Sequence, residues 1–357
     1  MFKKISVGSK ITALVITVVL ITVVTISFTA YNLVNTNLQE QYVERLEVIT
    51  SLKKDQVESF FSQQRQSAEQ IGRVLSWGDT NDYIQAGNMM GLDSATNGIE
   101  LAVGAQIRSI VDANPSLAHI YLLNSNNKIL YTTNADPALK AGEYFVNPDG
   151  KSPDNSLEEG FHSFPYEKDG GYSVLSGLSL QDKQATLLLE IRMDPVFSLL
   201  NDTTGLGNSG EILLTRLYKD RAVYIKPSRH IGNDLLSKTI DIGGSQQQAA
   251  QRSLETKSGA LVDKDYRGKQ TVAAWNNIPS TGWGIITKID TEEINRDSRA
   301  LIYSFVIAGI TITVLGFLVS IVFSRFLTEP LLTLKSTLKS MSQGVLPEKV
   351  EKASNDE

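Results

Sequence analysis

Gly205, Gly207 and Gly210 complete the pattern G-x-G-x-x-G, which cradles a pyrophosphate in dinucleotide-binding proteins. That chemistry needs a strand before the loop and a helix after it, because the phosphates bind at the helix N-terminus. Here a helix-like segment precedes the glycines, and the apolar, strand-like residues 211–217 follow them. The order is inverted, so the glycines predict a tight turn with positive φ that leads into a sheet, and no nucleotide site.

Residues that could form a catalytic set or bind a metal are scattered along the sequence. The three histidines, His119, His162 and His230, lack the short spacing of a metal-binding pair. The chain has no cysteine, which excludes disulfides, thiolate metal ligands and a cysteine nucleophile. It also lacks a serine elbow of the G-x-S-x-G type. We therefore expect no catalytic residues, no metal and no cofactor in this chain.

One long predicted loop, residues 136–172, has the composition of a small-molecule pocket. Aromatic residues cluster there with Gly, Pro and Asp, and ligand pockets combine aromatic walls with a few fixed polar groups. The alternative is that these aromatics only pin the loop to a sheet. If the loop binds a ligand, we expect a small polar or anionic metabolite that also contacts the strand at 120–123. The candidate ligand-binding residues are Tyr121, Tyr144, Phe145, His162, Tyr166 and Tyr172.

Two predicted hairpins and a helix position this loop. A helix over 99–113 ends before Asn114-Pro115, a helix stop. Residues 118–133 predict a strand, a polar turn and a strand, and residues 172–193 predict a second hairpin around Gln181-Asp182-Lys183. Together they predict one α+β unit.

A second, smaller α+β unit follows along the chain. It comprises a short helix, a hairpin around Lys219-Asp220, a polar helical stretch and three more strands. The segments are 194–202, 210–217, 222–227, 242–256, 258–268, 269–278 and 282–290.

Residues 32–76 predict one long helix with apolar residues near a period of 3.5. They are Leu38, Tyr42, Leu46, Ile49, Phe60, Ile71 and Val74. This stripe fits either the seam of a parallel homodimer, led by Leu38, Tyr42 and Ile49, or a helix packed on its own domain.

Two uncharged segments, 11–31 and 300–323, are each long enough to cross a bilayer of about 30 Å. The alternative for the first is a cleaved signal peptide, whose apolar region is usually shorter. Lysine and arginine gather in 1–10 and in 324–357, so both chain ends are expected in the cytoplasm. We therefore predict a multi-pass protein of the inner (cell) membrane, in contact with lipid, with 32–299 periplasmic or extracellular.

The order of elements resembles the double Cache family of extracytoplasmic sensors. Three segments carry the resemblance: TGLGNSGEILL at 204–214, YRGKQTVAAWNNIP at 266–279 and GWGIITKIDTEEI at 282–294. It implies a long N-terminal helix with two PAS-like antiparallel-sheet units, a distal unit at about 77–195 and a proximal unit at about 196–290. The resemblance also implies that the distal unit closes over a ligand. The R-x-W-Y run of amino-acid-binding members is absent, which lowers the expectation of an α-amino-acid ligand.

Residues 324–357 resemble the first half of a HAMP relay. In that resemblance Pro330 begins a helix after the membrane span, Gly344 ends it, and Glu357 stands where the second helix would begin. A HAMP dimer is a four-helix bundle with two helices from each chain, so this segment is expected to be partial, with an output domain beyond it.

Together these features predict a signal-transduction receptor that senses an extracytoplasmic small molecule. One alternative is the N-terminal part of a sensor enzyme, such as a histidine kinase, nucleotide or diguanylate cyclase or phosphatase, or of a chemoreceptor. A surface scaffold is a further alternative, which the HAMP-like segment disfavours. The net charge of −5 gives no reason to expect nucleic acid as a partner.

Overall fold

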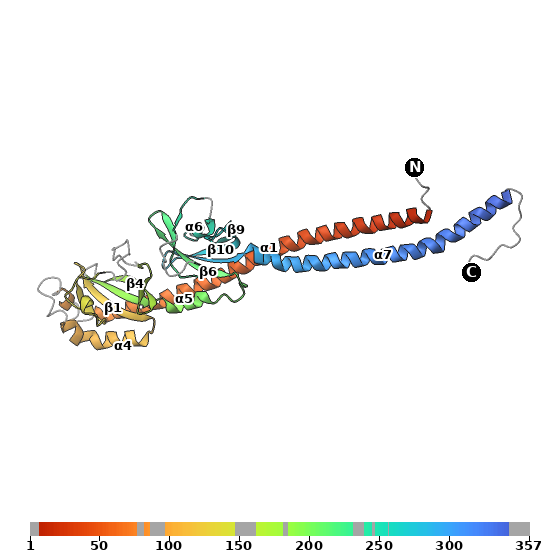
Figure 1. Ribbon diagram of the computed structural model, residues 1–357. Coiled ribbons are helices and arrows are strands. Elements are labelled where there is room, and N and C mark those ends of the chain that lie inside the picture. Colours follow the sequence, from red (N-terminus) through yellow and green to blue (C-terminus); the bar gives the residue numbers. More distant parts are fainter. Residues whose placement is uncertain are drawn as a thin grey trace. The chain divides into compact units, whose positions relative to one another are not determined.

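The computed structural model describes residues 7–76, 82–85, 97–146, 162–180, 185–230, 239–244, 247–255 and 257–342. The chain forms two compact units. One combines the two ends of the chain, Met1–Glu40 and Ile294–Glu357, and the other is Gln41–Glu293. Figure 1 labels several elements of both units.

The first unit is helical. It contains the N-terminal part of α1 (Val7–Leu75) and most of α7 (Thr291–Ser342). Within this unit the helices approach closely at Gly309, where an added Cβ would lie 2.7 Å from Val23 Cγ1. A small residue at this position therefore allows the two helices to pack.

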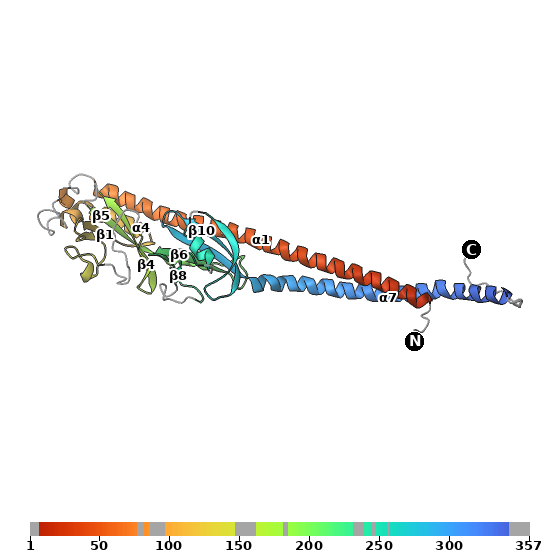
Figure 2. The same cartoon turned by 90° about the horizontal axis from the view of Figure 1, so that it is seen from above.

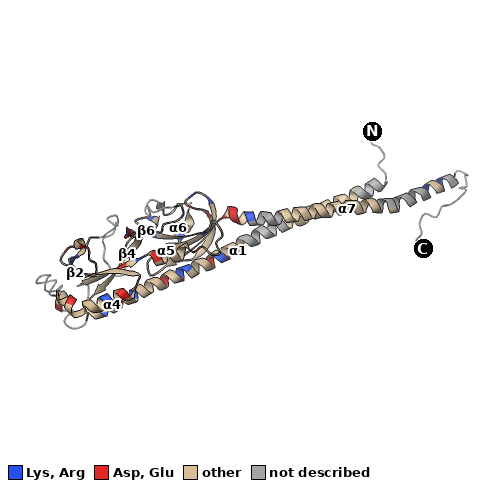
Figure 3. Cartoon of the chain, turned by 60° about the horizontal axis from the view of Figure 1, so that its bottom comes forward, with Lys and Arg blue, Asp and Glu red and all other residues tan. Residues whose placement is uncertain are grey.

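One helix among the described residues is long and apolar enough to cross a membrane. It is Tyr303–Val322, with a mean hydropathy of 2.6 and no charged side chain (Figure 3). The apolar part of α1 that the structure describes, Ala13–Thr29, is shorter. The second predicted span is thus supported by composition, and the first remains a prediction.

The distal sheet has five antiparallel strands in the order β2-β1-β5-β4-β3. They are β1 (Leu117–Asn124), β2 (Ile129–Thr132), β3 (Tyr166–Lys168), β4 (Gly171–Leu180) and β5 (Ala185–Arg192). A π-helical turn (Glu100–Gly104) and α4 (Ala105–Ala113) precede them, and the helix ends at Asn114 as predicted. The short strand β3 lies inside the segment predicted as loop, because three residues are too few to show a period.

The proximal sheet has six antiparallel strands in the order β8-β7-β6-β11-β10-β9. They are β6 (Glu211–Tyr218), β7 (Arg221–Tyr224), β8 (Thr239–Asp241), β9 (Gly259–Lys264), β10 (Gln270–Ile278) and β11 (Trp283–Asp290). The helix α5 (Asp194–Asn201) precedes β6. The predicted helical stretch 242–256 is wrong in extent, since α6 covers only Gln248–Arg252. The prediction of an α+β chain with two antiparallel-sheet units is confirmed.

From Gln41 onward, α1 belongs to the second unit, where it runs beside both sheets (Figures 1 and 2). Its buried face has a clear helical period of three and four residues. The buried positions are Leu46, Thr50, Lys53, Val57, Phe61, Gln64, Ala68, Ile71 and Leu75. This face packs on the chain's own domain.

The predicted apolar stripe of α1 only partly coincides with that buried face. Leu46 and Ile71 lie on it, whereas Tyr42, Ile49 and Phe60 are half-buried. Lys53 belongs to the buried face because its Nζ donates to the carbonyl of Leu199 at 2.8 Å. The side chain of Leu38 lies outside the described residues, and the dimer seam stays a prediction.

The predicted helix start at Pro330 is wrong, because α7 begins at Thr291 and continues through this residue to Ser342. A proline removes one backbone donor and can bend a helix without ending it. Gly344 and Glu357, the other two predicted relay residues, lie outside the described residues, as do Gln181-Asp182-Lys183.

Candidate ligand site and the Glu293 clasp

Several polar residues of the distal sheet gather around Glu190, near the C-terminal end of the central strand β5. The register places its Cα opposite His119 on β1 and Leu175 on β4. Residues opposite one another across paired strands share a face. His119, Tyr121, Leu175 and Glu190 therefore lie on one face of the sheet.

Glu190 is fully buried, and three neighbouring groups form a closed network around it. Lys168 Nζ lies 2.7 Å from Oε1 and 2.9 Å from Oε2 of Glu190. The hydroxyl of Tyr121 donates to Glu190 Oε2 at 2.7 Å and accepts from Asn134 Nδ2 at 2.7 Å. This pairing is what permits a carboxylate to lie inside the sheet unit, since an unpaired buried charge is strongly unfavourable.

The electrostatics of this face favour neutral partners around the ion pair. Burial, and then the Glu190 charge, raise the pKa of Tyr121 far above its ordinary value. Burial lowers the pKa of His119, although the Glu190 charge opposes the change. Both side chains are therefore uncharged at neutral pH, and they can donate or accept hydrogen bonds.

The aromatic residues predicted to bind ligand divide into two groups. Phe145 packs edge-on against Tyr121, with ring centroids 5.0 Å apart, and Tyr166 belongs to the same buried cluster. Tyr144 lies beside them at the surface, 60% exposed, with Lys128 Nζ 4.9 Å from its ring centroid. The structure thus brings together Tyr121, Phe145 and Tyr166, with Tyr144 adjacent.

His162 and Tyr172 lie elsewhere. Tyr172 packs against Phe197 of α5, with ring centroids 5.5 Å apart. His162 packs against Phe61 of α1 at 5.1 Å and pairs with Ser176 of β4. Side chains alternate along a strand, so Tyr172 and Ser176 face away from Leu175 and the Glu190 cluster. The prediction that all six aromatic residues share one place is therefore wrong.

Sequence reasoning missed Glu190, Lys168 and Asn134. Glu190 did carry a signal, because it is a charged residue inside the otherwise apolar run ATLLLEI. A charged residue at a buried strand position needs a partner. Lys168 was not identifiable as that partner because it lies on β3, which the sequence did not predict.

The glycine motif at 205–210 forms a turn that binds a carboxylate of the chain itself. Gly205 and Gly207 have φ of 84° and 67°, which confirms the predicted positive-φ turn. Behind the turn, the backbone N–H groups of Asn208 and Ser209 each donate to the Glu293 carboxylate at 2.7 Å. The Ser209 hydroxyl donates to the same group. We call this arrangement the Glu293 clasp.

Close packing also explains two of the glycines. An added Cβ at Gly207 would lie 2.6 Å from Glu293 Oε1, and one at Gly210 would overlap the Leu206 side chain. Gly210 is thus required by close packing, whereas its φ is not positive. Since β6 follows the turn, the inverted order expected for this motif is confirmed.

Comparisons with known proteins give no family for this chain. No family model matches it, and no curated protein matches it.

Three solved sensory domains are similar in structure. The ligand-binding domain of the Campylobacter jejuni chemoreceptor Tlp3, in complex with L-valine, is 15% identical over 74% of this chain and 98% of that chain, with a TM-score of 0.48. The periplasmic sensory domain of the Campylobacter jejuni chemoreceptor Tlp1 is 12% identical over 72% and 98%, with a TM-score of 0.46. The ligand-binding domain of Mlp24 with asparagine is 15% identical over 74% and 97%, with a TM-score of 0.42. These matches are distant, so the functional inference rests on the residues of this chain.

The proximal sheet holds its own buried ion cluster around Lys288. Its Nζ lies 2.7 Å from Glu211 Oε2 and 2.6 Å from Asp265 Oδ2. Burial alone would raise the pKa of both carboxyls, but Lys288 and Arg267, with a hydrogen bond from Tyr266 to Glu211, together outweigh it and lower both pKa values. The cavity beside this cluster is about 20 Å³, room for a single water. The cluster therefore has the character of a structural core.

Proposed function

We propose that this chain is the membrane-anchored sensor part of a signalling receptor. One observation carries the proposal: β11 of the proximal sheet ends at Asp290 and α7 begins at Thr291, with no intervening loop. The same helix contains the apolar stretch Tyr303–Val322. A change in the proximal sheet would therefore be passed along the backbone into this helix, which we propose spans the membrane.

The Glu293 clasp strengthens this connection. Because the turn before β6 holds a side chain in the first turn of α7, sheet and helix are joined by the backbone and by hydrogen bonds. Any ligand that favours one state of the sheet unit would bias the helix by the difference between its affinities for the two states. Beyond the membrane we propose a HAMP-like relay from Pro330 onward, in a parallel dimer.

The distal face around Glu190 is the proposed ligand site. A polar solute can enter this network by replacing Lys168 or Asn134 as a hydrogen-bond partner, with Tyr144 and Phe145 at its edge. The exposure of Tyr144 is what distinguishes this place from a closed structural core. The ligand class remains a small polar metabolite from outside the cytoplasm.

Topology provides the first test. Reporter fusions at Asn147 and Ser342 should report opposite compartments, with Asn147 outside the cytoplasm. Two cytoplasmic readouts would contradict the receptor proposal.

Ligand screening provides the second test. A small solute that binds the folded full chain should raise its melting temperature by mass action. Tyr144→Ala should remove that rise, and Tyr172→Ala is the matched control because Tyr172 lies on the opposite face. A rise that survives Tyr144→Ala and disappears in Tyr172→Ala would place the ligand elsewhere.

A further inference from the structure

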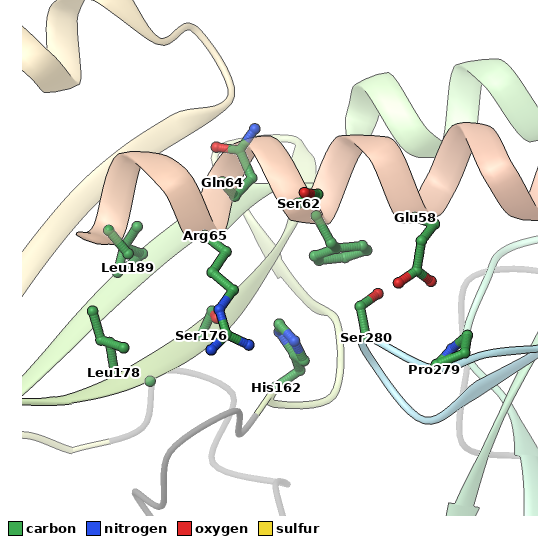
Figure 4. Close-up of a pocket in the computed structure, with 13 residues that line it drawn as sticks. Glu58, Ser62, Gln64, Arg65, His162, Ser176, Leu178, Leu189, Pro279 and Ser280 are labelled. Carbon is green, nitrogen blue, oxygen red and sulfur yellow. The ribbon is translucent and has the colours of Figure 1, made fainter. Parts of the chain in front are cut away.

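A cavity of about 390 Å³ lies between α1 and the two sheets of the second unit. Its walls are Phe61 and Arg65 of α1, His162, Ser176 of β4 and Ser280 in the turn between β10 and β11 (Figure 4). The volume is within the range of small-molecule sites. The cavity is separate from the Glu190 network, because Ser176 and Glu190 face opposite sides of the distal sheet.

Two residues that line this cavity each have a buried polar atom without a hydrogen-bond partner among the described residues. The two atoms are Oε2 of Glu58 and Nδ1 of His162. Figure 4 shows Glu58 extending from α1 toward Ser280, with the His162 ring on the other side of that serine. Buried polar atoms in folded proteins are nearly always paired. Two unpaired polar atoms beside one cavity therefore indicate a missing partner.

The protonation state of His162 defines the group that the cavity can accept. Burial lowers its pKa to about 4, against a backbone hydrogen bond with Ser280 that acts in the opposite direction. The ring is neutral at physiological pH and carries one N–H and one lone pair. In the tautomer that carries its proton on Nε2, the unpartnered Nδ1 offers its lone pair. Glu58 and His162 thus each offer an acceptor, and a group with several N–H donors could satisfy both.

The aromatic wall favours the same chemistry. Phe61 packs against His162 at 5.1 Å and against Trp283 at 5.3 Å, so its ring is fixed at the side of the cavity. Ring faces attract ammonium groups. Arg65 also lines the cavity, but its side chain is 66% exposed and its Nε pairs with Glu69 at 3.2 Å. Its charge also acts on His162 and contributes to the lowered pKa of that ring, and the Glu69 carboxylate offsets part of this charge.

We propose that this cavity is a second ligand site, for a small molecule with a primary ammonium group held by Glu58 and His162. The ligand would contact α1, the distal sheet and the β10–β11 turn together, so it would bind only when these three elements are packed. It would stabilise that packing by mass action and would favour the state of the sensor that contains it. This inference does not depend on the Glu190 site.

The test uses the full chain in lipid nanodiscs and n-butylammonium chloride as the probe. At constant ionic strength, butylammonium should raise the melting temperature in a saturable manner, while butyrate and n-butanol of the same length should not. Glu58→Gln should weaken binding roughly 10-fold to 100-fold, because a charge-assisted hydrogen bond is lost. Glu47→Gln is the matched control, since Glu47 is exposed on the same helix and does not line the cavity.

Ser62→Phe is a second variant that should abolish the shift by filling the cavity from its exposed edge. It keeps the test valid if Glu58→Gln melts too low to measure. Butylammonium binding that is undiminished in both variants would overturn the proposal. The same holds if the wild-type chain shows no shift, or an equal shift with all three solutes. A different outcome would count against the distal site alone: no solute gives a rise in melting temperature that depends on Tyr144, while butylammonium still binds.

Discussion

Gly207→Ala tests the Glu293 clasp directly, because two different costs meet at this residue. The backbone has φ of 67°, where an alanine is strained by about 1–2 kcal/mol. The added Cβ would also lie 2.6 Å from Glu293 Oε1 and must displace the carboxylate. Displacement breaks the two N–H bonds from Asn208 and Ser209, each worth about 1–2 kcal/mol at this half-exposed position. The expected loss is therefore about 3–6 kcal/mol.

Gly205→Ala is the matched control in the same turn. Its φ is 84°, but an added Cβ would meet only Ile49 Cδ1 at 3.5 Å, an ordinary contact. The free energy of unfolding of Gly205→Ala should therefore fall only by the cost of backbone strain, about 1–2 kcal/mol. For a unit of this size, 1 kcal/mol lowers the melting temperature by about 2–4 °C. Thermal unfolding followed by circular dichroism therefore distinguishes the two variants.

A double-mutant cycle with Glu293→Ala completes the test. Without the carboxylate, Gly207→Ala should cost no more than Gly205→Ala, which gives a coupling energy of about 2–4 kcal/mol. Equal costs for the two glycine variants in the wild-type background would refute the clasp. So would a difference that persists after Glu293→Ala.

Two further predictions follow from buried charged and titratable groups. Lys168→Met leaves the fully buried Glu190 carboxylate unpaired and should cost about 3–5 kcal/mol in thermal unfolding, and adding Glu190→Leu should restore most of it. If the double variant is as unstable as Lys168→Met, then the buried charge is not the cause. Burial lowers the pKa of His162 to about 4 from an unfolded value near 6.5. The stability that comes from burying the neutral ring is therefore complete above pH 6.5 and is lost as the pH falls toward 4. His162→Gln should therefore reduce the pH dependence of stability in this window by up to about 3 kcal/mol. Identical pH profiles for the two proteins would contradict it.

The sequence predicted the strands well where the apolar residues were concentrated. Segments such as 282–290, in which every residue of β11 is buried, have the length and composition of a central strand. The hairpin predicted around Lys219-Asp220 is confirmed, because β6 and β7 pair with Tyr218 opposite Arg221 and Lys219 has a positive φ in the turn. The short edge strands β3 and β8 were not predictable, since three residues give no periodic signal and packing alone decides their state.

The site was predicted less well, for a geometric reason. The aromatic residues between 144 and 172 are close in sequence, but the strand period sends alternate residues to opposite faces. Tyr166 joined the Glu190 face, whereas Tyr172 and His162 joined the face toward the helices. Composition can show that a segment is rich in ligand-binding residue types. It cannot show how the sheet distributes them.

The buried charged residues also show what the sequence cannot predict, which is the partner of each charge. Lys53, Glu190 and Lys288 are buried, and each finds its partner on a different element: Leu199, Lys168 and Asp265. A charge in an apolar run is visible in the sequence, and its burial requires a partner. The partner's identity depends on which elements lie side by side, and that is determined by the sheet order. Glu58 belongs to the same class of residue, with one difference. Its Oε2 is buried without a partner among the described residues, and it lines a cavity large enough to hold one.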